Sequence, residues 1–135
     1  MNCLSRVRTW NSDKVNDGTQ DEVKVSFPAS PAFTRIGRVT VAGLALRLGV
    51  DLADVEKLRL AVDQAVAALH GAGRINLNAR WMPHQLSITI DNPDHVLDEP
   101  TSQAVTKSLA SMVDEVLVGP TAISLLLAGG TRSFH

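Results

Sequence analysis

Cysteine, an excess of one charge and long apolar runs are what the sequence lacks most clearly. The 135 residues include one cysteine, Cys3, which excludes an internal disulfide and argues against a disulfide-dependent secreted scaffold. The 13 Lys and Arg residues nearly balance the 14 Asp and Glu residues. No domain-wide basic field therefore favours binding to nucleic acid or to a membrane surface.

The apolar segments are too short for a membrane span or a signal peptide. The longest run, VTVAGLALRLGV at 39–50, is interrupted by Arg47, whereas a spanning helix needs about 20 apolar residues. The first residues lack the continuous apolar core that a signal peptide contains. We therefore expect a cytoplasmic protein that contacts neither a membrane nor nucleic acid directly.

What is present predicts a single domain flanked by two tails. A chain of this length can bury one core but not two. Residues 1–21 are too polar to offset the entropy cost of ordering. We expect a flexible tail there, a domain over 22–128 and a short C-terminal tail over 129–135. No internal repeat or low-complexity segment divides the chain.

A strand and a long helix open the predicted domain. In VKVSF at 23–27, apolar and polar residues alternate with the period of a strand. Ser30-Pro31 is typical of a helix start and Gly49 of a helix stop, which predicts a helix over about 31–48. Such a helix is expected to contact something on a second side as well. Its apolar residues divide into an expected core face of Phe33, Ile36, Val41, Leu44 and Leu48, and further apolar surface at Val39 and Leu46.

A second helix and a β-hairpin follow. Asp51 can cap a helix over about 52–69 whose apolar residues recur at steps of three and four, namely Val55, Leu58, Val62, Ala65, Val66 and Leu69. Two alternating runs, 75–81 and 86–90, flank a Met-Pro-His-Gln turn and predict an antiparallel hairpin. Trp81 follows this alternation and is interpreted as a strand residue that packs on the sheet.

The last part of the domain predicts one helix and two strands. Residues 91–100 are a loop by composition, and Thr101 or Ser102 can cap a helix through about Val113. The runs EVLV and TAISLLLA then predict two strands around Gly119-Pro120. The order β-α-α-β-β-α-β-β predicts an α+β two-layer sandwich, with all helices on one face of an antiparallel or mixed sheet.

The stretch LRLAVDQA at 58–65, placed in this order of elements, resembles the anti-sigma-factor serine kinases of bacterial stress response and sporulation. That family belongs to the histidine-kinase-like ATPases, and the likeness spans roughly 22–128. The resemblance implies the Bergerat fold, Mg-ATP as cofactor, and phosphate transfer to a serine of an anti-anti-sigma protein. It also implies homodimers, or heterodimers with a family member, that hold a sigma factor.

Two positions of this motif depart from the family. Its members commonly read LRLAVDEA, two variable residues and an asparagine; the glutamate is the general base and the asparagine a Mg²⁺ ligand. Here these positions are Gln64 and Ala68. An amide cannot take up a proton at neutral pH, and alanine has no oxygen for a hard cation. His70 does not replace the family histidine, which lies four residues beyond the asparagine. We expect no catalytic residue and no nucleotide cofactor, unless the altered pocket still binds Mg-ATP.

The other nucleotide motifs are also altered. The family's Asp-x-Gly-x-Gly matches at Asp91, but Pro93 and His95 replace its glycines. The phosphate-binding Gly-x-Gly falls near Gln103 and Val105, where a glycine-free turn cannot offer the same backbone amides. The family's Gly-Thr before the final strand is matched in part by Pro120-Thr121. The resemblance therefore implies a remnant nucleotide site at Asp91 and Thr121.

Simpler interpretations of these residues stay open. Asp63 and Gln64 can be polar residues on a solvated helix flank, and Asp91 can end a strand and start an Asx-type turn with Asn92. The histidines show no metal-ligand spacing with one another or with Cys3, so we expect no metal site.

Arg35 and Arg38 are the candidate partner-binding residues. They lie three apart on the first predicted helix, and the resemblance places Arg38 where the family presents an arginine to its sigma factor. The alternative is two solvated surface arginines, but the apolar residues beside them favour an interface. We therefore expect a regulatory protein that binds a sigma factor, an anti-anti-sigma protein or a partner kinase. The alternative is an active serine kinase in which Asp63 replaces the missing glutamate.

Overall fold

The computed structural model describes residues 21–128. Within this range the chain forms a five-stranded sheet and three α-helices, in the predicted order. The strands are β1 (Asp21–Pro28), β2 (Arg74–Met82), β3 (Gln85–Asp91), β4 (Glu115–Val118) and β5 (Ala122–Ala128). A 3-10 turn (Pro31–Phe33) precedes α1 (Thr34–Arg47), and the other helices are α2 (Leu52–Ala68) and α3 (Glu99–Leu109). The predicted tails lie outside the described residues, except that Asp21 begins β1.

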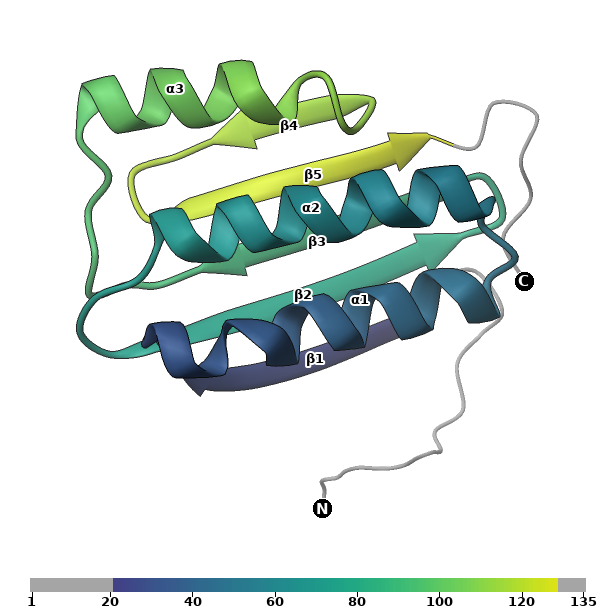
Figure 1. The fold of residues 1–135 in the computed structure, drawn as a ribbon, viewed down its shortest axis with the longest axis horizontal. Coiled ribbons are helices and arrows are strands. Elements are labelled where there is room, and N and C mark those ends of the chain that lie inside the picture. Colours follow the sequence, from purple (N-terminus) through teal and green to yellow (C-terminus); the bar gives the residue numbers. More distant parts are fainter. Residues whose placement is uncertain (1–20, 129–135) are drawn as a thin grey trace.

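The helices form one layer and the sheet the other. The strand order is β1-β2-β3-β5-β4, and every neighbouring pair is antiparallel. Figure 1 shows the three helices on the same face of the sheet, with α1 over β1 and β2 and α3 beside β4. The predicted α+β arrangement is therefore confirmed, and of the two predicted kinds of sheet, the structure has the antiparallel one.

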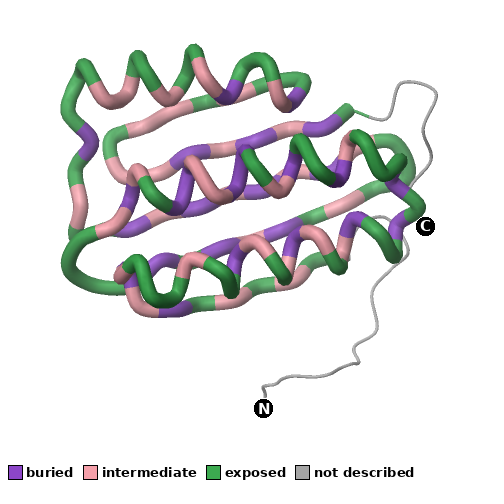
Figure 2. Tube along the Cα trace, in the orientation of Figure 1, coloured by how far each residue is buried: buried purple, intermediate pink, exposed green. Residues whose placement is uncertain are grey.

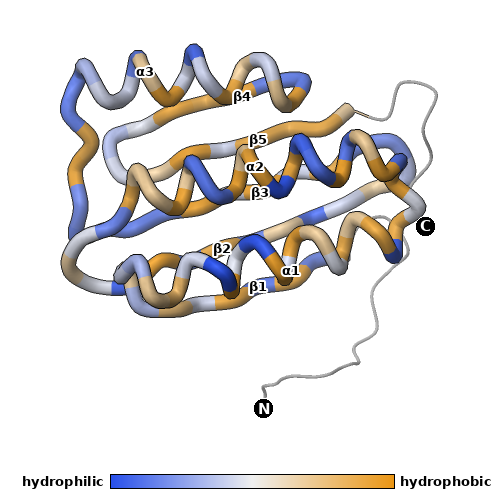
Figure 3. The backbone as a smooth tube through the Cα atoms, in the orientation of Figure 1, coloured by the Kyte–Doolittle hydropathy of each residue, from blue (hydrophilic) through white to orange (hydrophobic). Residues whose placement is uncertain are grey.

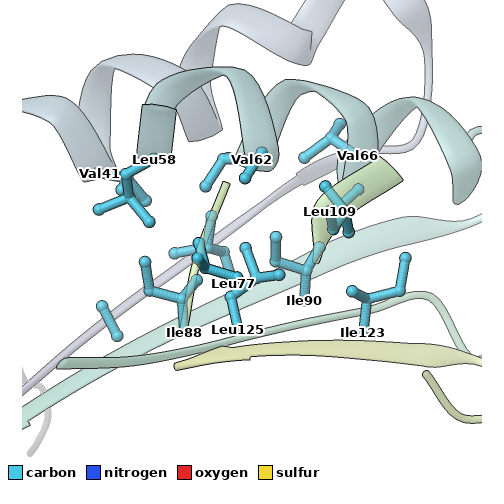
Figure 4. Close-up of a cluster of buried hydrophobic side chains, with 14 of the residues drawn as sticks. Val41, Leu58, Val62, Val66, Leu77, Ile88, Ile90, Leu109, Ile123 and Leu125 are labelled. Atoms are coloured by element: carbon cyan, nitrogen blue, oxygen red, sulfur yellow. The ribbon is translucent and has the colours of Figure 1, made fainter. Parts of the chain in front are cut away.

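Alternation along the strands places the core between the two layers. Side chains of β2 and β3 that point toward the helices are buried, except for the half-buried Trp81 near the hairpin turn, which packs against the core. Their neighbours on the opposite face are half-buried or exposed. All six predicted core residues of the second helix are also buried. Figure 4 shows side chains of α1 and α2 meeting those of the sheet, including Val41, Leu58, Val62, Leu77, Ile88 and Leu125.

The first helix differs from its prediction on one side. Gly49 ends the helix region with φ +80°, as the sequence predicted, but Ser30 makes no side-chain cap hydrogen bond and precedes a 3-10 turn. Phe33 and Ile36 were expected to face the core and are instead 39% and 36% exposed. The core face begins one turn later and contains Gly37, Val41 and Ala45. Figure 2 shows exposed positions recurring along α1.

The start and end of α3 also correct the prediction. Asp98, rather than Thr101 or Ser102, caps the helix, and its carboxylate accepts a hydrogen bond from the Thr101 N–H at 2.8 Å. The helix ends at Leu109 instead of about Val113. Val113 is nevertheless buried, in the turn that leads to β4. The sequence therefore predicted the helix but placed its end four residues too late.

The sheet face away from the helices is mostly polar. Its positions follow from the register and include Lys24, Asn78, Thr89 and Ser124 in one row across four strands. Figure 3 shows the alternation of apolar and polar residues that produces these two faces. Because these side chains are polar, this face of the sheet can be exposed to solvent without a covering layer of helices.

Candidate functional site

Gln64, at the family's general-base position, lies on the side of α2 that faces α3. The Ser108 hydroxyl of α3 donates a hydrogen bond to Gln64 Oε1. The Met112 sulfur, in the turn after α3, lies 4.0 Å from Gln64 Nε2. Both polar ends of this half-buried amide are thus engaged by the α3 segment, and the amide offers no base for proton transfer.

Ala68, at the family's magnesium position, is the last residue of α2 and packs against the core. Its methyl group offers no ligand to a cation. Gln103 and Val105, expected near a phosphate-binding turn, lie inside α3, beyond its first turn. Backbone N–H groups beyond the first four residues of a helix are bonded within the helix. They are therefore not free to bind phosphate.

Asp91 and Gln64 lie on different faces of the sheet. Asp91 is the last residue of β3 and faces away from the helices, in register with Asn76 and Ala122. Thr121 lies beside this end of β3, and its carbonyl accepts the Asn92 N–H at 2.9 Å. The structure therefore brings the two remnant nucleotide positions together, but it separates Asp91 from Gln64.

Asn92 is the inward-pointing polar residue at this end of β3. Its side chain is fully buried. Its Nδ2 donates to the carbonyls of Leu69 at 2.9 Å and Ala72 at 3.0 Å, and its Oδ1 accepts the Asp94 N–H at 3.0 Å. Asn92, and not Asp91, therefore makes the Asx-type turn. The sequence analysis did not predict this role, although the alternation that points residues 86, 88 and 90 inward also points residue 92 inward.

The loop after β3 packs against the loop after α2. Gly73 has φ +82°, and a Cβ atom there would overlap the Asp94 carboxylate. A Cβ atom on Gly71 would lie 3.0 Å from His95 Nδ1. The segment with Pro93 and His95 therefore occupies space beside the end of α2 that glycines would leave open.

Asp63 lies on the other flank of α2, toward α1. Its Oδ2 lies 3.5 Å from Arg38 Nη1, and the two side chains are 25% and 35% exposed. Asp63 Oδ1 is inaccessible to solvent and accepts no hydrogen bond from the described residues. Arg59, one turn earlier on α2, forms an ion pair with Glu56 at 2.9 Å. The three polar residues of LRLAVDQA thus make their closest polar contacts with three different partners.

No protein-family model matches this chain, and no curated protein matches it. Within 21–128, no group of three or more His, Cys, Asp or Glu side chains is placed to hold a metal ion. No helix of that same range has the length and apolar content that crossing a membrane requires.

The two candidate arginines of α1 have different surroundings. Arg38 is half-buried and paired with Asp63, whereas Arg35 is exposed. The outer face of α1 exposes large apolar side chains, of which Val39, one turn after Arg35, is 62% accessible and Leu46, near the end of the helix, 56%. An arginine next to accessible apolar surface can anchor a protein partner.

A depression of about 160 Å³ lies elsewhere on the molecule. Its lining residues come from the turn end of the β2–β3 hairpin and are Arg80, Trp81, Met82, Gln85 and Ser87. This end of β3 is opposite to the end that carries Asp91. The depression therefore does not include any of the candidate site residues.

Proposed function

We propose that this protein is a non-catalytic relative of the anti-sigma-factor serine kinases that regulates transcription by binding a protein partner. The partner is a sigma factor, an anti-anti-sigma protein or a kinase of the same family. We also propose that its α+β sandwich is the Bergerat fold of histidine-kinase-like ATPases. The element order and the position of LRLAVDQA in α2 support this assignment.

The outer face of α1 is the observation that carries the binding function. The outer face of α1 leaves Ile36, Val39 and Leu46 accessible to solvent, and the exposed Arg35 lies one turn before Val39. Accessible apolar surface with arginine next to it is the composition of interface anchors rather than of an ordinary solvated helix. This supports α1 as the partner-binding element.

The α2–α3 contact supports the loss of phosphoryl transfer. Gln64 accepts a hydrogen bond from Ser108 of α3, and Ala68 packs its methyl group against the core. A Mg-ATP site in the family's manner needs a base and a cation ligand at these positions. The chain offers neither group there.

The active-kinase alternative requires Asp63 to act as the base. Neighbours on a helix differ by about 100° around its axis, and Asp63 faces Arg38 of α1 while Gln64 faces α3. This geometry favours the binding function. Phosphate transfer from ATP to an anti-anti-sigma protein, lost in Asp63→Asn, would establish the kinase instead.

Calorimetry tests the nucleotide part of the proposal. We expect no heat of binding when the full chain is titrated with ATP or ADP, with or without Mg²⁺, while circular dichroism shows it folded. Mg-dependent binding would contradict the interpretation of Gln64 and Ala68 and would favour the kinase.

Charge reversal tests the binding part. Arg35→Glu with Arg38→Glu should weaken capture of a sigma factor or anti-anti-sigma protein and leave the fold intact. Circular dichroism must verify that the variant is folded, because Arg38→Glu also replaces the ion pair with Asp63 by two like charges. Lys107→Glu, an exposed cation on α3, is the control. Unchanged capture by the double variant would exclude this surface as the binding site.

A structural subunit that only pairs with an active family member is a third possibility. Size-exclusion chromatography of the chain alone and with such a relative separates it from a self-sufficient binder. If the chain alone binds a sigma factor, without an active family member present, the purely structural role is excluded.

A further inference from the structure

The accessible residues on the outer face of α1 have the spacing of a helix-packing seam. Ile36, Val39, Gly43 and Leu46 follow one another at steps of three, four and three residues, and all four are exposed. We name these four residues the α1 seam. Steps of three and four are those of the a and d positions through which one helix packs on another. The seam lies opposite the buried residues Val41 and Ala45.

The middle of the seam leaves room for a second backbone. A Cβ atom added to Gly43 would meet no atom within 4 Å, so this position is open on its outer side. Packed helices approach to about 8–10 Å between axes, depending on the side chains at the contact. A glycine flanked by Val39 and Leu46 allows a docking helix to insert a large side chain at this position.

The charge around the seam has one sign. Residues 31–50 contain three arginines and no acidic residue, although the whole chain has a net charge of −1. At about 100° per residue, Arg35 and Arg47 lie on opposite flanks of the seam, and both are exposed. Arg38 is turned toward Asp63 of α2. A second α1 would bring three more arginines and no carboxylate, so the seam offers no acidic partner to another copy of itself.

We infer that the occupant of the α1 seam is an amphipathic helix with apolar a and d residues and acidic residues on both flanks. Its apolar residues would pack into the seam, and its carboxylates would pair with Arg35 and Arg47. This inference rests on the binding function proposed above and adds the chemistry of the partner. It assigns Arg35 and Arg47 a direct contact, whereas Arg38 keeps its pair with Asp63.

The test uses two synthetic helical peptides of about three heptads. Both carry leucine at a and d; one has glutamate at the flanking e and g positions and the other has lysine. Each is labelled with fluorescein and titrated with the full chain, and binding is read by fluorescence anisotropy. We expect the glutamate peptide to bind at least about tenfold more tightly, and its advantage to shrink as salt is raised.

Variants assign the binding to this surface. Arg35→Glu with Arg47→Glu should reverse the preference, so that the lysine peptide binds more tightly. A merely destabilised helix would weaken both peptides alike. Val39→Asp should abolish binding of the glutamate peptide, whereas Val96→Asp, at a 71% exposed apolar residue before α3, should not. Circular dichroism of each variant verifies that it is folded.

Three results would overturn the inference. The first is that neither peptide binds the folded chain, and the second is that both bind equally. The third is concentration-dependent self-association in sedimentation that Val39→Asp abolishes, which would assign the seam to a second copy. Failure of the peptides together with intact capture of a sigma factor or anti-anti-sigma protein would overturn only the inference about the seam. Conversely, peptide binding without any sigma-factor or anti-anti-sigma capture would contradict only the proposed function.

Discussion

At the scale of single residues, Asn92 holds together three segments that are separate in sequence. A fully buried amide is costly unless its donors and acceptor are satisfied, and here both donors and the acceptor have partners. These partners belong to the end of α2, the loop after it and the loop after β3. The buried amide thus fixes how the two loops meet.

Replacing Asn92 with alanine should therefore destabilise the protein strongly. Three hydrogen bonds are lost and the buried Leu69 carbonyl is left without its donor, which we expect to cost about 2–4 kcal/mol of unfolding free energy. Urea unfolding monitored by circular dichroism measures this loss. Asn76→Ala, at an exposed amide on the polar sheet face, should change stability by less than about 0.5 kcal/mol. Equal effects would contradict the role of Asn92.

His70 should make stability depend on pH. Its Nε2 lies 2.9 Å from Thr34 Oγ1, and burial lowers its pKa from the ordinary 6.5. The unfolded chain then binds the proton more readily than the folded chain does. The contribution of neutral His70 is complete above pH 6.5 and is lost as the pH falls toward the lower pKa of the folded state. His70→Gln should flatten the fall in stability between pH 7 and 5, measured by urea unfolding; an unchanged slope would contradict this.

At the scale of elements, α3 is attached differently from α1 and α2. Of its own residues Leu109 alone is fully buried, and Val105 is partly buried against the core. The hydrogen bond from Ser108 to Gln64 adds a polar contact with α2. Because so little of α3 is buried, this polar contact is a substantial part of what positions the helix.

A double-mutant cycle on Gln64→Ala and Ser108→Ala measures that contact. We expect a coupling free energy of about 0.5–1.5 kcal/mol, the range of a net intramolecular hydrogen bond. Amide exchange should become faster in α3 of each single variant, while α1 keeps its protection. Thr106→Ala with Gln64→Ala is the control pair, because Thr106 bonds within its own helix. Coupling in the control pair as large as in the test pair would exclude the specific contact.

At the scale of the whole molecule, one core between two layers supports the fold. Leu125 lies near its centre on β5 and is 1% exposed, whereas Leu117 on the edge strand β4 is 74% exposed. These two leucines of one sheet are therefore expected to contribute very differently to the free energy of unfolding.

Leu125→Ala should cost about 2–5 kcal/mol of unfolding free energy, because it leaves a cavity in the core. Leu117→Ala should change it by no more than about 0.5 kcal/mol. Chemical unfolding of both variants, with the slope against denaturant compared to that of the parent chain, checks this. Similar losses would mean that the core does not lie where the structure places it.

The sequence by itself determined the elements and most of the core. Alternation in the hairpin and three- and four-residue steps in α2 each relate a residue to its near neighbours, so periodicity alone assigns Leu58, Ile88 and Ile90 to the inside. It also indicated that α1 has apolar residues on a second side. The mistaken start of α3 arose because Thr101 and Ser102 are as good caps as Asp98 on sequence grounds.

Only the tertiary structure decided what the polar residues of α2 contact. Asp63 and Gln64 are adjacent in sequence, yet Asp63 faces Arg38 of α1 and Gln64 faces Ser108 of α3. Helical geometry predicts that the two side chains point in different directions, but it does not predict which element lies on each side. The exposure of Ile36 likewise depends on how α1 sits on the sheet. Such contacts join residues far apart in the chain, and local sequence patterns carry no information about them.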